Sequence, residues 1–284
     1  MKKKKIIIFT IDCSYSTIYL ESLLPKIHQK VPMICISDRF GGDHGNIFSH
    51  FLSYWKNSGI KYVNYLGAVF VYYKPLNYIL NKLSSGIPLK RKYRSIKQMA
   101  DYYNIPVMMV SDINVESVEN RIRQMEPDLI LSAYFDQIMK KNIFSIPELG
   151  TINFHPGVLP AFPGPAASFW AMKHDKAVGS TIHYVDSGID TGKIISQDVL
   201  RDLTTRSVLG ADYQIFSRGA HYTLKAITMI ENGTDEPLKQ DGDGTYYSYP
   251  TPIDIAEAAQ KKVRIFSFRD FLKYFLPLKQ AAGE

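Results

Sequence analysis

The stretch Thr151-Ile-Asn-Phe-His-Pro-Gly-Val-Leu-Pro160 joins a short apolar strand to a proline-rich loop. Asn153 and His155 are two residues apart, so an extended backbone points both side chains to the same side. Asp190 follows thirty-five residues after His155. An amide, an imidazole and a carboxylate that meet at strand ends form an acid–base and oxyanion-stabilising set. The set has no Ser or Cys nucleophile, which predicts that the attacking group belongs to the substrate.

The flanking segments alternate between apolar strands and helices. The chain opens with a β-branched run at Lys5–Thr10, a helix at Thr17–Lys30 and a strand at Met33–Ser37, an order typical of parallel sheets. The alternation returns after residue 95, with strands predicted at Val107–Val110, Leu129–Ser132, Gly150–Phe154, Ala177–Tyr184 and Lys193–Leu200. We therefore predict an α/β fold with a Rossmann-like, doubly wound, mostly parallel sheet. No G-x-G-x-x-G follows the first strand, so a dinucleotide cofactor has no support.

Two further segments differ from this alternation. Residues from about 40 to 92 include a part, Ile47–Leu83, that is rich in aromatic residues and is predicted to be helical. Its apolar surface needs a cover: the main domain, a second subunit, a ligand or a membrane surface. After a long helix at Ser207–Asn232, the tail is predicted to contain one more helix, Ser267–Phe275.

The composition bounds the class of protein. The chain has 284 residues, of which 45% are hydrophobic and 21% charged, as in an ordinary globular protein, and its net charge is +7. This charge suits an anionic ligand, a nucleic acid or an acidic membrane face. Two cysteines without metal-ligand spacing predict neither a disulfide framework nor a metal site. With no signal-peptide core after the N-terminal lysines, we expect a cytoplasmic protein.

Residues 95–232 resemble the 10-formyltetrahydrofolate-dependent formyltransferases, a family that includes the methionyl-tRNA, glycinamide ribonucleotide and sugar N-formyltransferases. Residues 1–37 are compatible with the first βαβ unit of that family. The resemblance rests on five stretches in the family's order and spacing: Pro127-Asp-Leu-Ile-Leu-Ser-Ala-Tyr134, Ile146-Pro-Glu-Leu-Gly150, Asn153-Phe-His-Pro-Gly-Val-Leu-Pro160, Gly164-Pro-Ala166 and Asp186-Ser-Gly-Ile-Asp-Thr-Gly192.

The resemblance implies a site and a donor. Asn153, His155 and Asp190 would be catalytic, with Asp190 raising the pKa of His155. The donor would be 10-formyltetrahydrofolate, without a metal. Its pterin would lie in a slot between two loops, formed by Tyr134, Phe135, Gln137 and Ile138 on one side and by Val185, Asp186, Gly188 and Ile189 on the other. His183 is expected to face the core or solvent and is assigned no chemistry.

The resemblance also implies a division of the chain and an acceptor. Residues 1–205 would be the catalytic domain, in which residues from about 40 to 92 would be an insertion where the family has a shorter connection. Residues 206–284 would be a helix and tail packed on this domain. Because the tail is too short for the β-barrel domain of the tRNA enzymes, we expect the acceptor to be a nucleotide-linked amino-deoxysugar for a surface glycan such as O-antigen. The candidates for acceptor contacts are Arg39, Asp43, His44 and Asn46.

Several alternatives remain open. The chain could instead formylate methionyl-tRNA, although a nucleic-acid partner is disfavoured, or it could hydrolyse formyltetrahydrofolate, with water as the acceptor. A non-enzymatic reading is a basic module for nucleic acid or a membrane surface around residues 47–94, where Tyr, Trp and Lys are interleaved. A homodimer and a membrane contact through residues 47–83 also stay open.

Overall fold

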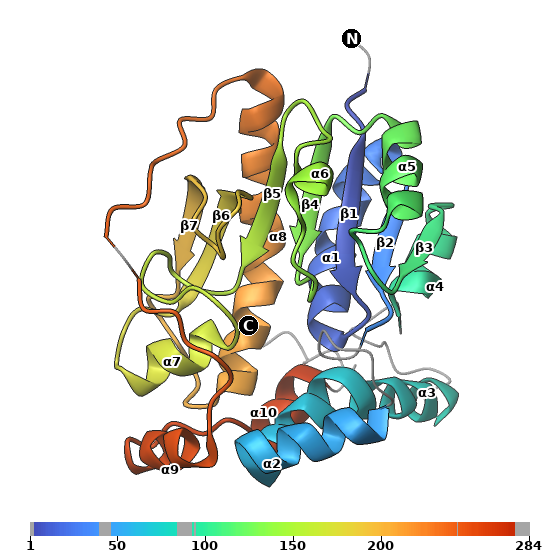
Figure 1. Cartoon of the computed structure of the whole chain (residues 1–284). Coiled ribbons are helices and arrows are strands. Elements are labelled where there is room, and N and C mark those ends of the chain that lie inside the picture. Colours follow the sequence, from blue (N-terminus) through green and yellow to red (C-terminus); the bar gives the residue numbers. More distant parts are fainter. Residues whose placement is uncertain (1–2, 40–46, 84–92, 94, 243, 276–284) are drawn as a thin grey trace, which may run out of the picture.

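A seven-stranded sheet forms the centre of the protein (Figure 1). The computed structural model describes residues 3–39, 47–83, 93, 95–242 and 244–275. The strand order is β3-β2-β1-β4-β5-β6-β7; β1 to β5 are parallel, and β6 and β7 add antiparallel at one edge. The strands are β1 (Ile6–Ile11), β2 (Ile34–Ser37), β3 (Val107–Val110), β4 (Leu129–Ala133), β5 (Thr151–His155), β6 (Gly179–Tyr184) and β7 (Ile194–Val199). The predicted α/β fold is confirmed.

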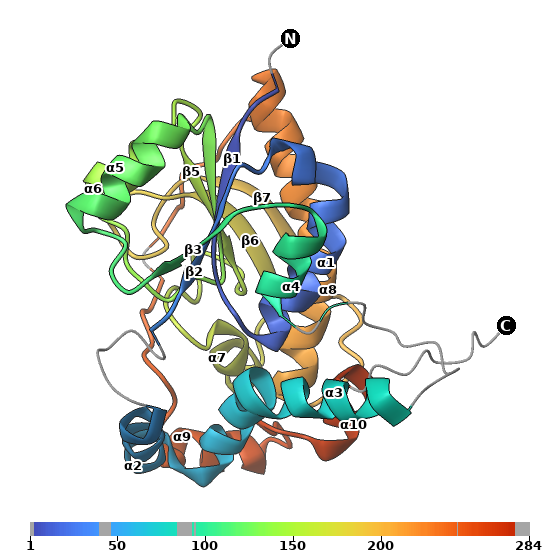
Figure 2. The same ribbon diagram turned by 90° about the vertical axis from the view of Figure 1, so that its right-hand side faces the viewer.

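The central strands are buried because helices cover both faces of the sheet. Every residue of β1 and β4 is buried, as expected for continuous apolar runs in a parallel sheet. Figure 2 shows the two layers. One face carries α1 (Ser14–Ile27), which ends in a short 3-10 turn (His28–Lys30), together with α4 (Ile96–Tyr102) and α8 (Val208–Asn232). The other face carries α5 (Glu116–Met125) and α6 (Lys141–Phe144).

A further layer of helices lies below the carboxyl ends of the parallel strands, where ligands bind in open α/β sheets (Figure 1). The insertion supplies α2 (Ile47–Leu66), a π-helix (Gly67–Tyr72) and α3 (Tyr73–Leu83), so this segment is helical as predicted. Between the sheet and this layer lies α7 (Ala167–Lys173). In the described part of the chain, no helix is both long and apolar enough to cross a bilayer.

The tail completes the lower layer with two helices, α9 (Pro252–Gln260) and α10 (Phe268–Phe275), where the sequence had predicted one. A capping box starts α9. The Thr251 hydroxyl accepts from the backbone N–H of Asp254, whose carboxylate accepts from the N–H of Thr251. The Thr-Pro-Ile-Asp pattern is a recognisable helix start, so this helix could have been predicted.

Helix α8 packs closely behind the strand that carries Asn153 and His155. The Tyr19 hydroxyl donates to Oγ1 of buried Thr223, which joins α1 to α8. Gly219 lies against Phe154, so that a Cβ added there would be 2.2 Å from the Phe154 ring. Only glycine lets the helix approach β5 this closely.

Replacing Gly219 by alanine tests this packing. Helix propensity alone would stabilise the protein by about 1 kcal/mol. We expect the opposite sign, a loss of about 1–3 kcal/mol, because Phe154 must shift in a filled core. Urea unfolding of Gly219→Ala measures the change. His221→Ala, at an exposed position of the same helix, is the control, and a Gly219→Ala variant more stable than the parent would contradict the close approach.

Candidate active site

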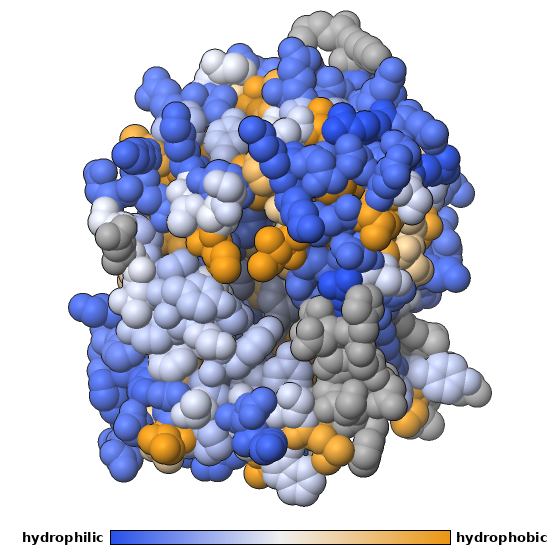
Figure 3. All heavy atoms as spheres, viewed as in Figure 1, coloured by the Kyte–Doolittle hydropathy of each residue, from blue (hydrophilic) through white to orange (hydrophobic). Residues whose placement is uncertain are grey.

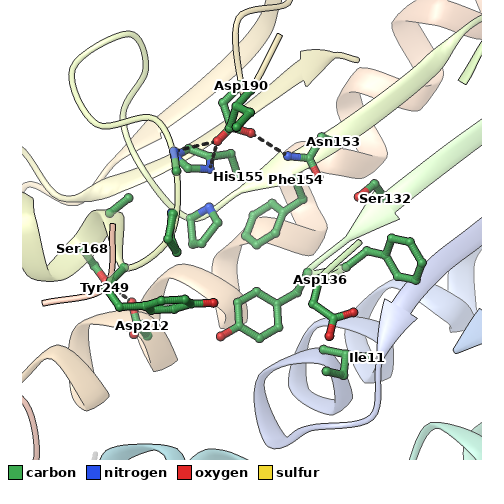
Figure 4. Close-up of a pocket in the computed structure, with 18 of the residues that line it drawn as sticks. Ile11, Ser132, Asp136, Asn153, Phe154, His155, Ser168, Asp190, Asp212 and Tyr249 are labelled. Atoms are coloured by element: carbon green, nitrogen blue, oxygen red, sulfur yellow. Dashed lines mark hydrogen bonds and ion pairs between the residues drawn. The ribbon is translucent and has the colours of Figure 1, made fainter. Parts of the chain in front are cut away.

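The end of β5 and the loop after β6 bring three polar side chains together. In the antiparallel ladder, Asn153 lies opposite His183, and His155 opposite Thr181. Asp190 returns from the loop after β6 toward the same point. Its Oδ1 lies 3.4 Å from Nδ2 of Asn153, and its Oδ2 lies 3.4 Å from Nδ1 of His155 (Figure 4). The structure thus brings together Asn153, His155 and Asp190.

A fourth side chain, His183, belongs to this cluster. It is buried, and its Nε2 lies 3.2 Å from Nδ2 of Asn153 and 3.5 Å from Oδ1 of Asp190. From the sequence, His183 is expected to face the core or solvent and is assigned no chemistry; the structure buries it beside Asn153 and Asp190. The role of His183 depends on the partner strand, because β6 pairs with β5 in the register that places His183 beside Asn153. Neither this pairing nor its register follows from the sequence of β6 alone.

The carboxylate of Asp190 is fixed by its surroundings. The backbone N–H of Gly164 donates to Oδ2 at 2.9 Å. The side chain of Gln240 donates to the backbone carbonyls of Asp190 and Gly192 at 2.8 and 2.7 Å, so the tail holds this loop. Asp190, Tyr134 and Ala166 have φ values of 55°, 57° and 58°. Left-handed non-glycine residues that line a cavity are typical of functional sites.

The hydrogen-bond partners of His155 constrain its protons. Its Nε2 lies 2.9 Å from the carbonyl oxygen of Phe162, which can only accept, so this nitrogen carries a proton. Burial lowers the pKa of His155; Asp190 raises it, but His183 lowers it further, and the net direction is down. The expectation that Asp190 raises the pKa of His155 describes one contribution, which burial outweighs. His155 is therefore neutral at rest near pH 7.

Asp190 stays ionised. Burial by itself would raise the pKa of this carboxyl group. The neighbouring rings of His155 and His183 and the N–H of Gly164 together outweigh burial, and they hold the pKa of Asp190 well below its ordinary value. The cluster therefore pairs a neutral imidazole with a carboxylate, and a proton that arrives on Nδ1 of His155 would complete an ion pair.

This cluster lies in the wall of a cavity of about 460 Å³. The face seen in Figure 3 is hollowed near its middle, between the sheet and the lower layer of helices. The eight residues predicted for the donor slot all line the cavity: Tyr134, Phe135, Gln137, Ile138, Val185, Asp186, Gly188 and Ile189. Ile138 and Ile189 are 73% and 46% exposed, which makes them available for an apolar ring.

Two of these eight residues shape the loops. The side chain of Gln137 is buried and bonds the N–H of Ile113, the Ser37 hydroxyl and the carbonyl of Val110. Oδ1 of Asp186 accepts from the N–H of Gly188 and from the Thr191 hydroxyl, which closes the turn before Asp190. The side chain of Gln137 thus serves the architecture of the slot.

The predicted acceptor contacts are not part of this cavity. Arg39 faces Asp112, with its Nη2 3.5 Å from Oδ2 of Asp112, and does not line the cavity. Asp43, His44 and Asn46 lie outside the described residues.

The opposite end of the cavity contains a group that the sequence reasoning missed. Asp212 of α8 is buried, and it accepts hydrogen bonds from the Ser168 hydroxyl of α7 and, at 2.6 Å, from the Tyr65 hydroxyl of α2. Tyr54, Tyr62 and Tyr249 line the same end. Figure 4 shows Asp212, Ser168 and Tyr249 grouped away from Asp190. The sequence offered one signal, a carboxylate within the apolar helix 207–232.

Burial raises the pKa of Asp212 to about 6, although the hydrogen bonds from Ser168 and Tyr65 lower it. This raised pKa makes the stability of the fold depend on pH. The folded state binds the carboxyl proton of Asp212 more tightly than the unfolded chain does. Asp212 therefore costs stability as pH rises from the unfolded pKa, near 3.8, through about 6.

Asp212→Asn should remove this cost, since the amide resembles the protonated form. We expect the stability difference between variant and parent to shift in favour of the variant by roughly 2.5 kcal/mol between pH 4 and pH 7, because a pKa unit is worth about 1.4 kcal/mol and the unfolded carboxyl is already partly ionised at pH 4. Urea unfolding at both pH values measures the shift. The exposed Asp202→Asn is the matched control, and a pH-independent difference for Asp212→Asn would contradict a buried, ionising carboxyl.

In the described part of the chain, no group of three His, Cys, Asp or Glu side chains is arranged to hold a metal ion.

Comparison with known proteins finds formyltransferases that are similar to part of this chain. Residues 92–209 match the family model described as formyl transferase. The methionyl-tRNA formyltransferase of Bacillus cytotoxicus is 33% identical over 156 residues, which are 54% of this chain and 49% of that protein. The chain therefore spans about half the length of the curated relatives that it matches.

Solved structures share the fold over most of the chain. The N-formyltransferase from Helicobacter canadensis, solved with folinic acid and dTDP-3-aminofucose, matches with a TM-score of 0.52 and 19% identity over 86% of this chain and 71% of its own. A 4-N formyltransferase from Francisella tularensis matches with a TM-score of 0.56 and 16% identity over 96% of this chain and 87% of its own. At these identities the likeness establishes the fold alone.

Proposed function

We propose that this chain, whose residues 92–209 match the formyl transferase family model, transfers the formyl group of 10-formyltetrahydrofolate to a primary amine. One observation carries the proposal. Asn153, His155 and Asp190 meet in the wall of a cavity that is bounded on one side by the loops 134–139 and 185–189. The donor's pterin would lie between these loops, with its formyl carbon beside the three side chains.

The amine is the nucleophile, and His155 is its base. A neutral His155 takes the proton that the amine loses when its nitrogen bonds to the formyl carbon. The resulting imidazolium lies between the carbonyl of Phe162 and the carboxylate of Asp190, two acceptors that stabilise its charge. As the bond from the formyl carbon to the folate nitrogen breaks, the proton passes to that nitrogen.

Asn153 stabilises the negative oxygen of the tetrahedral intermediate. Its Nδ2 donates to Nε2 of His183 at 3.2 Å and to Asp190 at 3.4 Å. In the reaction, the negative oxygen of the intermediate takes the place of Asp190 as the acceptor of the longer of these two hydrogen bonds. One such donor is typically worth about 3 kcal/mol. His183 holds the amide in place, since its Nδ1 lies 2.8 Å from the carbonyl of Tyr184.

The acceptor amine enters from the end lined by tyrosines and Asp212. Tyrosine rings and a hydrogen-bonding carboxyl group suit a hydroxylated ring. This supports the amino group of a nucleotide-linked amino-deoxysugar as the acceptor, used in the cytoplasm for a surface glycan such as O-antigen. The Helicobacter canadensis N-formyltransferase, which shares this fold, was solved with a molecule of this class, dTDP-3-aminofucose.

Methionyl-tRNA is the second candidate acceptor, because the methionyl-tRNA formyltransferases match residues of this chain at 33% identity. An assay with 10-formyltetrahydrofolate and a panel of acceptors, read by mass spectrometry, separates the candidates. The panel contains amino-sugar nucleotides, methionyl-tRNA and water alone, which reports hydrolysis as free formate.

His155→Ala and Asp190→Asn each remove one partner of the proton path. We expect transfer to fall at least about 10³-fold in either variant while the fold persists. Formyl incorporation measures the loss, and circular dichroism checks folding. Asp198→Asn, which removes a carboxylate paired with Arg218 outside the cavity, is a control for the loss of a buried charge. A folded Asp190→Asn enzyme with parental turnover would refute the proposed chemistry.

The pH dependence of kcat/KM should report His155. As a base it works only when neutral, and its pKa lies below the ordinary 6.5. Activity should therefore fall in two steps as the pH drops, first through the pKa of the acceptor amine, which must be neutral to attack, and then more steeply through the lowered pKa of His155. Two acceptors of different basicity should move the first step only. A step that stays above pH 6.5 whichever acceptor is used would contradict a neutral resting His155.

A further inference from the structure

A second cavity, of about 420 Å³, lies between α2 and the segment that follows α9. Lys61 and Asn64 of α2 form one wall, and Lys262 and Arg264 form the other. In both views α2 and α9 lie side by side in the lower layer (Figures 1 and 2). The insertion and the tail therefore build this cavity jointly.

The charge of the second cavity favours an anion. Lys61, Lys262 and Arg264 are exposed, and within the described residues none of them pairs with a carboxylate. No Asp or Glu of that part of the chain lines the cavity. Three cations that converge on one concave surface without a counter-ion raise the local concentration of anions, and Arg offers the paired donors that match phosphate oxygens.

The rest of the second cavity is apolar. Val263 and Ile265 are buried, and Phe266 is partly buried. An aromatic and aliphatic floor below three cations suits a ligand that combines a flat ring with phosphate groups. A nucleoside diphosphate has this composition.

The two cavities adjoin. Ile265 lines both, and Tyr62 and Tyr65, which line the first cavity, stand next to Lys61 and Asn64 on α2. The described lining of the first cavity includes Asp136, Asp186, Asp190 and Asp212 but no Lys or Arg. A diphosphate would be repelled there, so the charged part of an acceptor needs a neighbouring basic site.

We propose that the second cavity binds the nucleoside diphosphate part of the acceptor, so that its amino-sugar part extends past Ile265 toward Asp190. This inference rests on the proposed formyl transfer and replaces Arg39 as an expected contact for the acceptor. It assigns recognition of the nucleotide to Lys61, Lys262 and Arg264, none of which belongs to the motif stretches of the family.

Calorimetric titration of the intact chain with dTDP tests this site without any folate. We expect dTDP to bind the parent protein. Lys61→Gln and Arg264→Gln should each weaken binding about tenfold, the loss expected for one charge-assisted hydrogen bond, and the double variant should weaken it further. Lys225→Gln removes an exposed lysine of α8 that lines neither cavity and should leave the affinity unchanged. Absent dTDP binding, or equal affinity in all variants, would overturn the proposal.

Two further arms separate the sources of phosphate and the two proposals. Inorganic phosphate should bind more weakly than dTDP, because the apolar floor then contributes nothing. A different outcome is that the protein binds phosphatidylglycerol vesicles through Lys61 and Arg264 and fails to bind dTDP. That result would identify a lipid headgroup as the ligand and contradict the proposal. Binding of dTDP without any formyl transfer would sustain this site and defeat the proposed function. Formyl transfer to amines that carry no phosphate, in a protein that does not bind dTDP, would support the proposed function and contradict this site.

Discussion

The carboxylate of Asp190 is the acceptor on which the arrangement of the site depends. It faces Asn153, His155 and His183 and accepts from the backbone of Gly164. A buried carboxylate is costly unless it is paired and hydrogen-bonded. These neighbours meet that condition, lower its pKa and keep it charged. The proposed chemistry depends on this charge, because a proton taken up by His155 turns its contact with the Asp190 carboxylate into an ion pair.

The sheet brings these groups together by changing direction at its edge. The parallel strands end on the side of the lower helix layer, and β5 places Asn153 and His155 there. Because β6 runs antiparallel to β5, His183 lies opposite Asn153 within the same ladder, and the chain then turns back with Asp190. The close approach of α8 at Gly219 supports β5 from behind. Local order at the site therefore follows from strand pairing and from helix packing.

The sequence predicted what is encoded locally. The β-branched runs gave the strands, and the aromatic segment 47–83 is helical as expected. The prediction of the donor slot named residues that all line one cavity. What it missed depends on distant pairing: the role of His183 needs the β5–β6 register, and Asp212 needs Tyr65 and Ser168 from other helices. Arg39 looked suitable by its charge, but its loop takes it to Asp112.

The hydrogen bonds of Gln240 join the two ends of the cavity. Through the carbonyls of Asp190 and Gly192, this residue ties the start of the tail to the carboxylate loop. A few residues later the same tail contributes Tyr249 to the other end of the cavity, and Trp170 donates to the carbonyl of Ser248 between them. The tail therefore forms part of the wall at one end of the cavity and holds the backbone of the Asp190 loop at the other.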